Sequence, residues 1–167
     1  ESVVITWRRA ASLDDEGGEE YTTTLPISNA TVKNVEHALE GSVGYIKLKQ
    51  ITQNADDLVR AAVEDLEAQG ATSFVLDIRD NPGGYLTQAV DVASLFVKSG
   101  TVVKIETREM DESTKVATGS FATDKPLVVL VNGNTAASAE VLAAALKDNQ
   151  RATLVGETTL GKGSVQV

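Results

Sequence analysis

From residue 43 to the end, the chain alternates between short apolar runs that predict strands and longer segments with helical periodicity. Residues 44–49 alternate apolar and polar side chains, as in a strand with one face buried. Residues 73–78 and 127–131 are almost wholly apolar, which is typical of strands inside a parallel sheet. Residues 101–106 and 152–156 complete the predicted strands of this part.

Helical patterns separate these strands. Residues 55–69 repeat apolar side chains on one face, with Asn54 as a candidate N-cap and Gly70 as a stop. Residues 86–97 and the alanine-rich residues 135–148 follow the same periodicity. Alternating strands and helices predict an α/β domain with a largely parallel sheet flanked by helices, and loops at the carboxyl ends of its strands form the ligand site in such folds.

The first part of the chain has a different pattern of residues. Residues 2–7 and 21–27 are rich in β-forming residues and predict a hairpin, whereas residues 31–41 suggest irregular structure. We therefore expect a β-rich segment over residues 1–28 and a separate core domain over residues 29–167.

Composition and charge exclude several functional classes. The 167 residues carry a net charge of −9, which repels phosphate backbones, so nucleic acid is not an expected partner. The absence of cysteine excludes thiol chemistry and disulfides, and no metal site or cofactor is expected. With one histidine, His37, in the irregular stretch, a serine–histidine–aspartate triad is not expected either.

Two loops and one lysine carry the candidate chemistry. Residues 79–84 and residues 132–138 each follow a predicted strand, and their backbone N–H groups could bind an oxyanion. Lys162 lies between two glycines in a predicted strand, where burial against residues 142–146 would lower the pKa of its amine. A neutral lysine can deprotonate a serine hydroxyl without a histidine.

Three motifs, in order, resemble the carboxy-terminal processing proteases, also called tail-specific proteases. Residues 77–84 (DIRDNPGG) match the D-x-R-x-N-P-G-G loop of that family, and residues 135–141 (TAASAEV) match its nucleophile motif. Residues 156–166 (GETTLGKGSVQ) match its G-x-x-T-x-G-K-G-x-V-Q motif. The resemblance implies a core like those of crotonases and Clp proteases, which would be incomplete at the C-terminus of this chain.

The resemblance also assigns roles. In the family the nucleophilic serine lies three residues before the glutamate and twenty-five before the lysine, which here is Ala137 by both counts. Lys162 would be the general base and Gln166 would orient its amine. The N–H of Ser138, with that of Gly83 or Gly84, would form the oxyanion hole.

Alanine at the nucleophile position has two explanations. A serine-to-alanine change would make this chain an inactive peptidase, which we favour. Alternatively, Ser138 could be the nucleophile in a shifted register, but a one-residue shift turns a helical side chain by about 100°. Glu140, Asp148, Asp77 and Arg79 are expected to hold local structure.

Function and location follow from the same resemblance. It implies a serine endopeptidase that cleaves unstructured protein C-termini outside the cytoplasm, in the periplasm, cell envelope or thylakoid lumen. Residues 1–28 would be the end of a peptide-binding PDZ domain, and the sequence leaves open whether the protein forms a homo-oligomer. A noncatalytic peptide-binding protein and an enzyme acting on acyl thioesters are the alternatives.

Overall fold

The chain divides into two units that are described separately. The computed structural model describes residues 2–10, 12, 17–27, 33–106 and 112–164. One unit comprises Glu1–Val32 and the other Lys33–Val167.

The first unit is a single antiparallel hairpin. Strand β1 (Ser2–Arg9) pairs with β2 (Glu19–Pro26) along its whole length. The rings of Trp7 and Tyr21 stack across the pair with their centroids 4.6 Å apart. The structure therefore confirms the hairpin predicted from the two β-rich runs.

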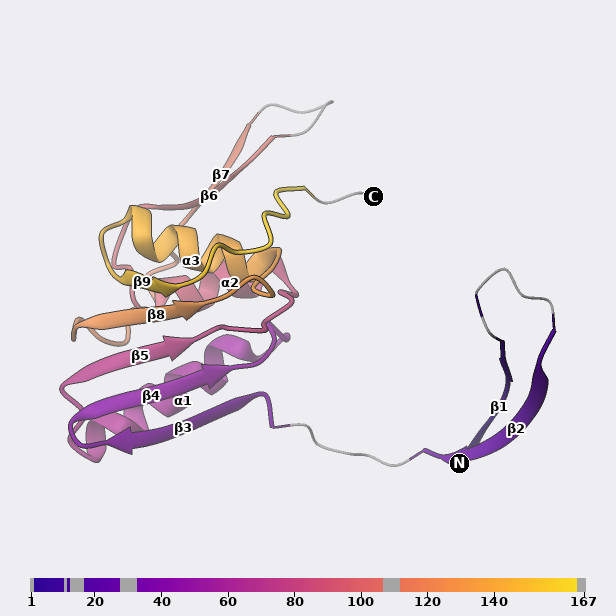
Figure 1. Cartoon of the computed structure of the whole chain (residues 1–167). Helices are drawn as coiled ribbons and strands as arrows, with labels where there is room; N and C mark the ends of the chain where they lie inside the picture. Colours follow the sequence, from indigo (N-terminus) through magenta and orange to yellow (C-terminus); the bar gives the residue numbers. More distant parts are fainter. Residues whose placement is uncertain (1, 11, 13–16, 28–32, 107–111, 165–167) are drawn as a thin grey trace. The chain divides into compact units, whose positions relative to one another are not determined.

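The second unit contains a five-stranded sheet in the order β3-β4-β5-β8-β9 (Figure 1). The first pair is antiparallel and the other three are parallel, which confirms the largely parallel sheet. The strands are β3 (Val35–Glu40), β4 (Val43–Leu48), β5 (Ser73–Asp77), β8 (Leu127–Val131) and β9 (Thr153–Gly156).

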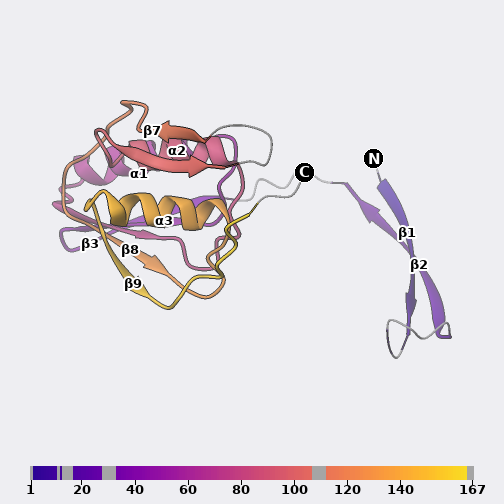
Figure 2. The same ribbon diagram turned by 90° about the horizontal axis from the view of Figure 1, so that it is seen from above.

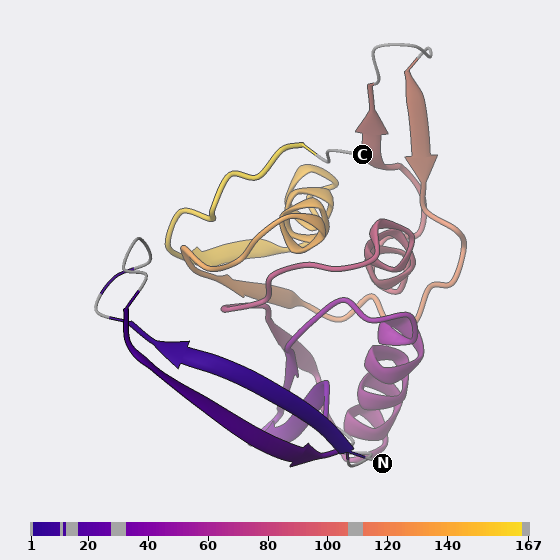
Figure 3. The same ribbon diagram turned by 90° about the vertical axis from the view of Figure 1, so that its right-hand side faces the viewer.

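Three helices cover one face of this sheet. Figures 2 and 3 show α1 (Ala55–Ala68), α2 (Leu86–Ser94) and α3 (Ser138–Asp148) on the same side of the strands. The buried side of each helix packs on alternate strand residues, such as Ile46 and Leu76, which are fully buried. A two-stranded sheet of β6 (Thr101–Ile105) and β7 (Ser113–Val116) completes the unit.

Two sequence expectations about elements are wrong. The stretch expected to be irregular contains β3, whose six residues pair fully with β4. His37 lies in β3, exposed, with its Nε2 atom 2.8 Å from Asp65 Oδ2. The alanine-rich helix begins at Ser138 rather than Thr135, because the Thr135 hydroxyl is bonded to the end of the neighbouring strand.

The parallel arrangement positions the candidate site. Strands β5 and β8 are neighbours and run in the same direction, so their carboxyl ends lie at one edge of the sheet. The loops expected to carry chemistry leave from these two ends and are therefore adjacent.

Candidate active site

Asn81 holds the loop that follows β5, residues 79–84, called here the glycine loop. The side chain is fully buried, and its Oδ1 atom accepts a hydrogen bond of 2.9 Å from the Gly83 N–H. Its Nδ2 atom donates to the carbonyl oxygen of Leu48 at 3.0 Å. Gly83 has a φ of 90°, which favours glycine, and the order Asn-Pro-Gly fits a type II turn.

The turn between β8 and α3, residues 132–138, contains an unusual backbone conformation. Ala137 has φ 53° and ψ −122°, in a region that costs a non-glycine residue roughly 1–3 kcal/mol. The turn is fixed by the two residues that precede Ala137. Thr135 Oγ1 donates to the Ile78 carbonyl at 2.9 Å, and the Ala136 N–H donates to the Asn81 carbonyl at 3.0 Å.

The glycine loop and the α3 turn are in direct contact. A Cβ atom placed on Gly83 would lie 3.0 Å from the Ala137 Cβ, 2.9 Å from the Ser138 nitrogen and 2.8 Å from the Ala136 carbonyl oxygen. Any side chain at position 83 would therefore occupy the space in front of Ala137. On the other side of the loop, Gly84 packs against the Ile51 backbone, where a Cβ would lie 2.0 Å from the carbonyl oxygen.

Two backbone N–H groups near Ala137 remain available. Within the described residues, neither the Gly84 N–H nor the Ser138 N–H has a hydrogen-bond acceptor, whereas Gly83 donates to Asn81. Ser138 is the first residue of α3, so its N–H is one of the unpaired donors of a helix start. An oxygen atom carrying negative charge would find two donors here.

Comparison with known proteins agrees with this arrangement. The family model for peptidase family S41 matches residues 42–167. The chain belongs to peptidase family S41. Curated sequences to which it is similar are named carboxyl-terminal- or carboxy-terminal-processing proteases.

Three relatives show the extent of the similarity. The carboxyl-terminal-processing protease of Synechocystis is 51% identical over 158 residues, which are 93% of this chain and 37% of the relative. A chloroplastic carboxyl-terminal-processing peptidase of Arabidopsis thaliana is 44% identical, covering 74% of this chain and 24% of the relative. CtpA of Bacillus subtilis is 36% identical over 76% of this chain and 28% of its own length. The chain thus spans about a quarter to a third of these relatives.

Solved structures show the same fold. The photosystem II D1 C-terminal processing protease superposes with a TM-score of 0.75 at 31% identity, covering 100% of this chain and 46% of that one. A Bacteroides fragilis protein described as an S41 protease gives a TM-score of 0.63 at 22% identity, over 96% of this chain and 48% of that one, and this likeness concerns the fold alone.

The side chain of Ser138 in this S41 chain is buried. Ser138 is 6% exposed, and its hydroxyl oxygen is buried without a hydrogen-bond partner in the described part of the chain. Ala137, by contrast, is only half-buried. The burial of the Ser138 hydroxyl disfavours the shifted register in which that hydroxyl would attack a substrate.

Glu140 connects the α3 turn to the segment that carries Lys162. Its carboxylate accepts the Ala137 N–H at 2.9 Å, which is the glutamate half of a capping box. It also accepts the Thr159 hydroxyl at 2.7 Å and the N–H groups of Gly161 and Lys162 at 2.6 and 2.9 Å. Burial raises the pKa of Glu140, but these four donors outweigh it and the net pKa is lowered.

The structure differs from the sequence expectations for Lys162. Strand β9 ends at Gly156, and residues 157–164 form no further strand, so the predicted strand around Lys162 is wrong. The residue is exposed, and the apolar residues of α3 do not cover it as expected. Gln166, expected to orient the lysine amine, lies outside the described residues.

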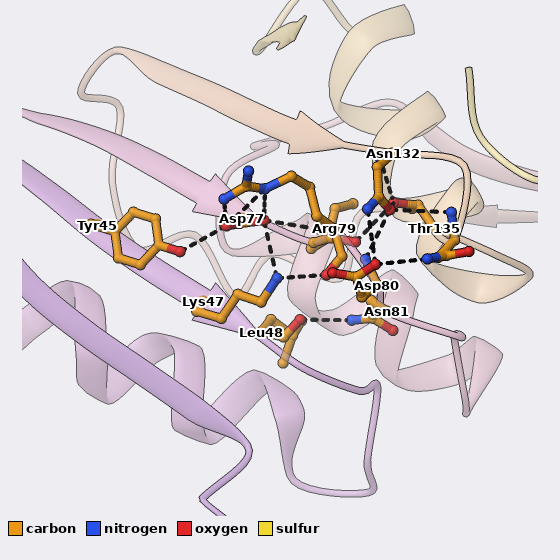
Figure 4. A network of polar contacts seen from close by, with 11 residues as sticks. Tyr45, Lys47, Leu48, Asp77, Arg79, Asp80, Asn81, Asn132 and Thr135 are labelled. Atoms are coloured by element: carbon orange, nitrogen blue, oxygen red, sulfur yellow. Dashed lines mark hydrogen bonds and ion pairs between the residues drawn. The ribbon is translucent and has the colours of Figure 1, made fainter. Parts of the chain in front are cut away.

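Asp77, the last residue of β5, and Arg79 hold local structure as expected: they form an ion pair within a larger network (Figure 4). The fully buried Asp77 accepts bonds from Arg79, Lys47 and the Tyr45 hydroxyl, the last at 2.7 Å. Burial raises the pKa of Asp77, but the bonds from Arg79 and Tyr45 and the charge of Lys47 lower it far below its usual range. Asp80 is bonded to Asn132 across the two loops at 2.9 Å.

Sequence reasoning missed three members of these networks: Tyr45, Lys47 and Asn81. Tyr45 and Lys47 are two residues apart on β4, so their side chains lie on the same face of the sheet. The parallel pairing of β4 with β5 places Lys47 beside Asp77. That pairing register was the missing information. For Asn81 a signal existed, because Asn before Pro-Gly is a frequent turn former.

None of the described helices has the length and apolar character needed to cross a bilayer.

Proposed function

We propose that this chain is the core of a serine endopeptidase that works by a serine–lysine mechanism, with Ala137 at the nucleophile position. Its substrates would be unstructured or C-terminal segments of proteins. The proposal is supported by family membership and by the contact between the glycine loop and the α3 turn.

The observation that carries the proposal is the backbone of Ala137. A strained, half-buried residue at a strand-to-helix turn, followed by one free N–H group and in contact with a glycine loop that carries another, is the arrangement that presents a nucleophile beside an oxyanion hole. Alanine gains nothing from this conformation. The surrounding hydrogen bonds nevertheless enforce it, through Thr135 on one side and Glu140 on the other.

With serine at position 137, each group would have a defined role. The neutral amine of Lys162 would take the hydroxyl proton as the oxygen attacks the scissile carbonyl. The N–H groups of Gly84 and Ser138 would stabilise the resulting oxyanion, and the protonated lysine would then give its proton to the leaving amine. Water would hydrolyse the acyl-enzyme by the same steps. Gln166 would hold the lysine amine in line.

This mechanism places one requirement on Lys162. Its side chain is exposed, and a general base must be able to take a proton from the nucleophile. Glu140 already fixes the Lys162 backbone beside the α3 turn, so the amine would need only a cover that removes it from water. Bound substrate or further protein segments could supply that cover.

A noncatalytic peptide-binding protein is the second candidate. The specific observation in its favour is that the residue in the nucleophile position has no hydroxyl. Such a protein would keep the two N–H donors and bind peptide without cleaving it.

Restoring the hydroxyl distinguishes the two candidates. The Ala137→Ser variant is incubated with an unstructured peptide that has an apolar C-terminus, and cleavage is followed by mass spectrometry. We expect cleavage that a second change, Lys162→Ala, abolishes, whereas Lys147→Ala, an exposed lysine on α3, leaves it intact. Peptide binding without cleavage by Ala137→Ser would support the peptide-binding protein instead.

The proposal extends to location, domain organisation and assembly. The relatives named as chloroplastic or found in cyanobacteria support action outside the cytoplasm, in the periplasm, cell envelope or thylakoid lumen. We propose that residues 1–28 belong to the end of a PDZ domain, on the basis of the hairpin and its position before the core. Size measurement in solution would decide whether the protein is a homo-oligomer.

A further inference from the structure

We propose that Asn81 is a positioning residue that turns the Gly84 N–H toward the substrate carbonyl. This inference rests on the proposed peptidase function and deepens it. Asn81 touches neither substrate nor nucleophile in this scheme and acts only through the peptide groups of the glycine loop.

Asn81 joins three segments: its own loop, the end of β4 and the α3 turn. Its N–H donates to the Ile78 carbonyl at 3.3 Å, and its carbonyl accepts the Ala136 N–H at 3.0 Å. Its side chain binds the Leu48 carbonyl and the Gly83 N–H at 3.0 and 2.9 Å. Every polar atom of this fully buried residue is therefore used.

The bond from Gly83 to Asn81 determines which glycine can bind an oxyanion. Ile51 forms a parallel bridge with Gly84, in which the Ile51 N–H donates to the Gly83 carbonyl and the Tyr85 N–H donates to the Ile51 carbonyl, both at 3.0 Å. Backbone groups alternate in direction along an extended segment, so the Gly84 N–H points away from Ile51. Gly83 cannot compete as a donor while Asn81 holds its N–H.

No other group of the glycine loop can replace this side chain. The Asp80 carboxylate, the other side-chain acceptor of the loop, is already bonded to Asn132 and Asn134. Without the Asn81 oxygen, the buried Gly83 N–H would lose its acceptor, and the Pro82–Gly83 peptide would be free to rotate toward another one. The Gly83–Gly84 peptide, which carries the Gly84 N–H, would then be held by its bond to Ile51 alone.

The size of the effect can be bounded. Removal of one oxyanion-hole donor lowers kcat by about 100- to 1,000-fold in well-studied enzymes. A donor that is present but not held in place should lose part of this contribution to kcat. In Asn81→Ala we therefore expect kcat to fall about 10- to 100-fold, with a small change in KM.

A matched pair of substitutions separates positioning from simple structural support. In the Ala137→Ser protein, Asn81→Ser and Asn81→Ala both lose the amide that binds Leu48 and leave a similar void. They differ by one hydroxyl oxygen, which can still accept the Gly83 N–H in a serine turn. Peptide cleavage gives kcat and KM for each variant, and hydrogen exchange reports protection of the Gly83 amide.

We expect Asn81→Ser to restore at least 10-fold in kcat relative to Asn81→Ala, together with protection of the Gly83 amide. Equal kcat values in the two variants would overturn the inference, because a purely structural role would affect both alike. If Asn81→Ala does not fold, Asn81→Thr and Asn81→Val form a second pair of closer volume, and the extended backbone before Pro82 suits both.

Failure of the proposed function gives a different result. In that case the Ala137→Ser protein with Asn81 intact does not cleave peptide, and the inference falls with it. If that protein cleaves peptide and both pairs show no difference, only the role of Asn81 is refuted.

Discussion

Replacing Glu140 by glutamine tests whether this carboxylate holds the Lys162 segment against the α3 turn. Its two oxygen atoms share four donors: Ala137 and Lys162 on Oε2, and Thr159 and Gly161 on Oε1. In Glu140→Gln one oxygen becomes an NH₂ group, so two donors face another donor.

The cost follows from the kind of bond that is lost. Hydrogen bonds to a charged group contribute about 1.5–3 kcal/mol each, and two are lost. Gly161 and Lys162 are exposed, so water can partly replace the acceptor, and we reduce the expected loss of unfolding free energy to about 2–3 kcal/mol.

The pH dependence provides an independent check. The pKa of Glu140 is lower in the folded protein than in the unfolded chain, where a glutamate titrates at about 4.3. The unfolded chain therefore binds the proton first, and the stabilisation by Glu140 is present above about pH 4.3 and lost as the pH falls through the folded pKa. The glutamine variant lacks this titration, so its stability should approach that of the parent at low pH.

Urea denaturation of both proteins between pH 7 and pH 3 measures the difference. Glu157→Gln is the matched control, since Glu157 lies in the same segment, is exposed and has no side-chain contact in the described part of the chain. The reasoning is refuted if Glu140→Gln costs no more than Glu157→Gln at pH 7, or if its deficit is the same at pH 3.

Three further predictions concern the loops. Gly84→Ala should prevent folding or lower the unfolding free energy by more than about 3 kcal/mol, because its Cβ would lie 2.0 Å from the Ile51 carbonyl oxygen. Gly41→Ala has open space around its Cβ and should lower the unfolding free energy by only about 1 kcal/mol. Thermal unfolding compares the two variants. Asp77→Asn should lower the unfolding free energy by about 1.5–3 kcal/mol, since it removes a buried charge that accepts hydrogen bonds from Lys47 and Tyr45, and a loss below about 1 kcal/mol in urea titrations would contradict this. Ala137→Gly should raise stability by about 1 kcal/mol by relieving the positive φ, and a decrease in Tm would show that the turn is not strained.

The sequence alone determined four of the five strands of the sheet and the two loops at the candidate site. The apolar run of residues 127–131 and the helical repeat of residues 55–69 are local patterns. Such patterns can be recognised without knowledge of the rest of the fold. Since parallel strands end at one edge, it also followed that residues 79–84 and 132–138 would be neighbours.

Strand β3 could not be found in this way. Its sequence has a weak alternation, with only Val35 buried, and it becomes a strand because it pairs with β4 along its full length. Pairing between strands is a property of the whole sheet, so no local pattern reports it.

The details of the candidate site were likewise decided by tertiary contacts. Only the contacts of Asn81 and Ile51 show that Gly84, rather than Gly83, keeps a free N–H. The backbone strain at Ala137 arises from bonds to residues far away in the chain, and the exposure of Lys162 depends on what packs over it. The sequence supplies the chemical groups, but their directions and their contact with water are set by distant segments that fold against them.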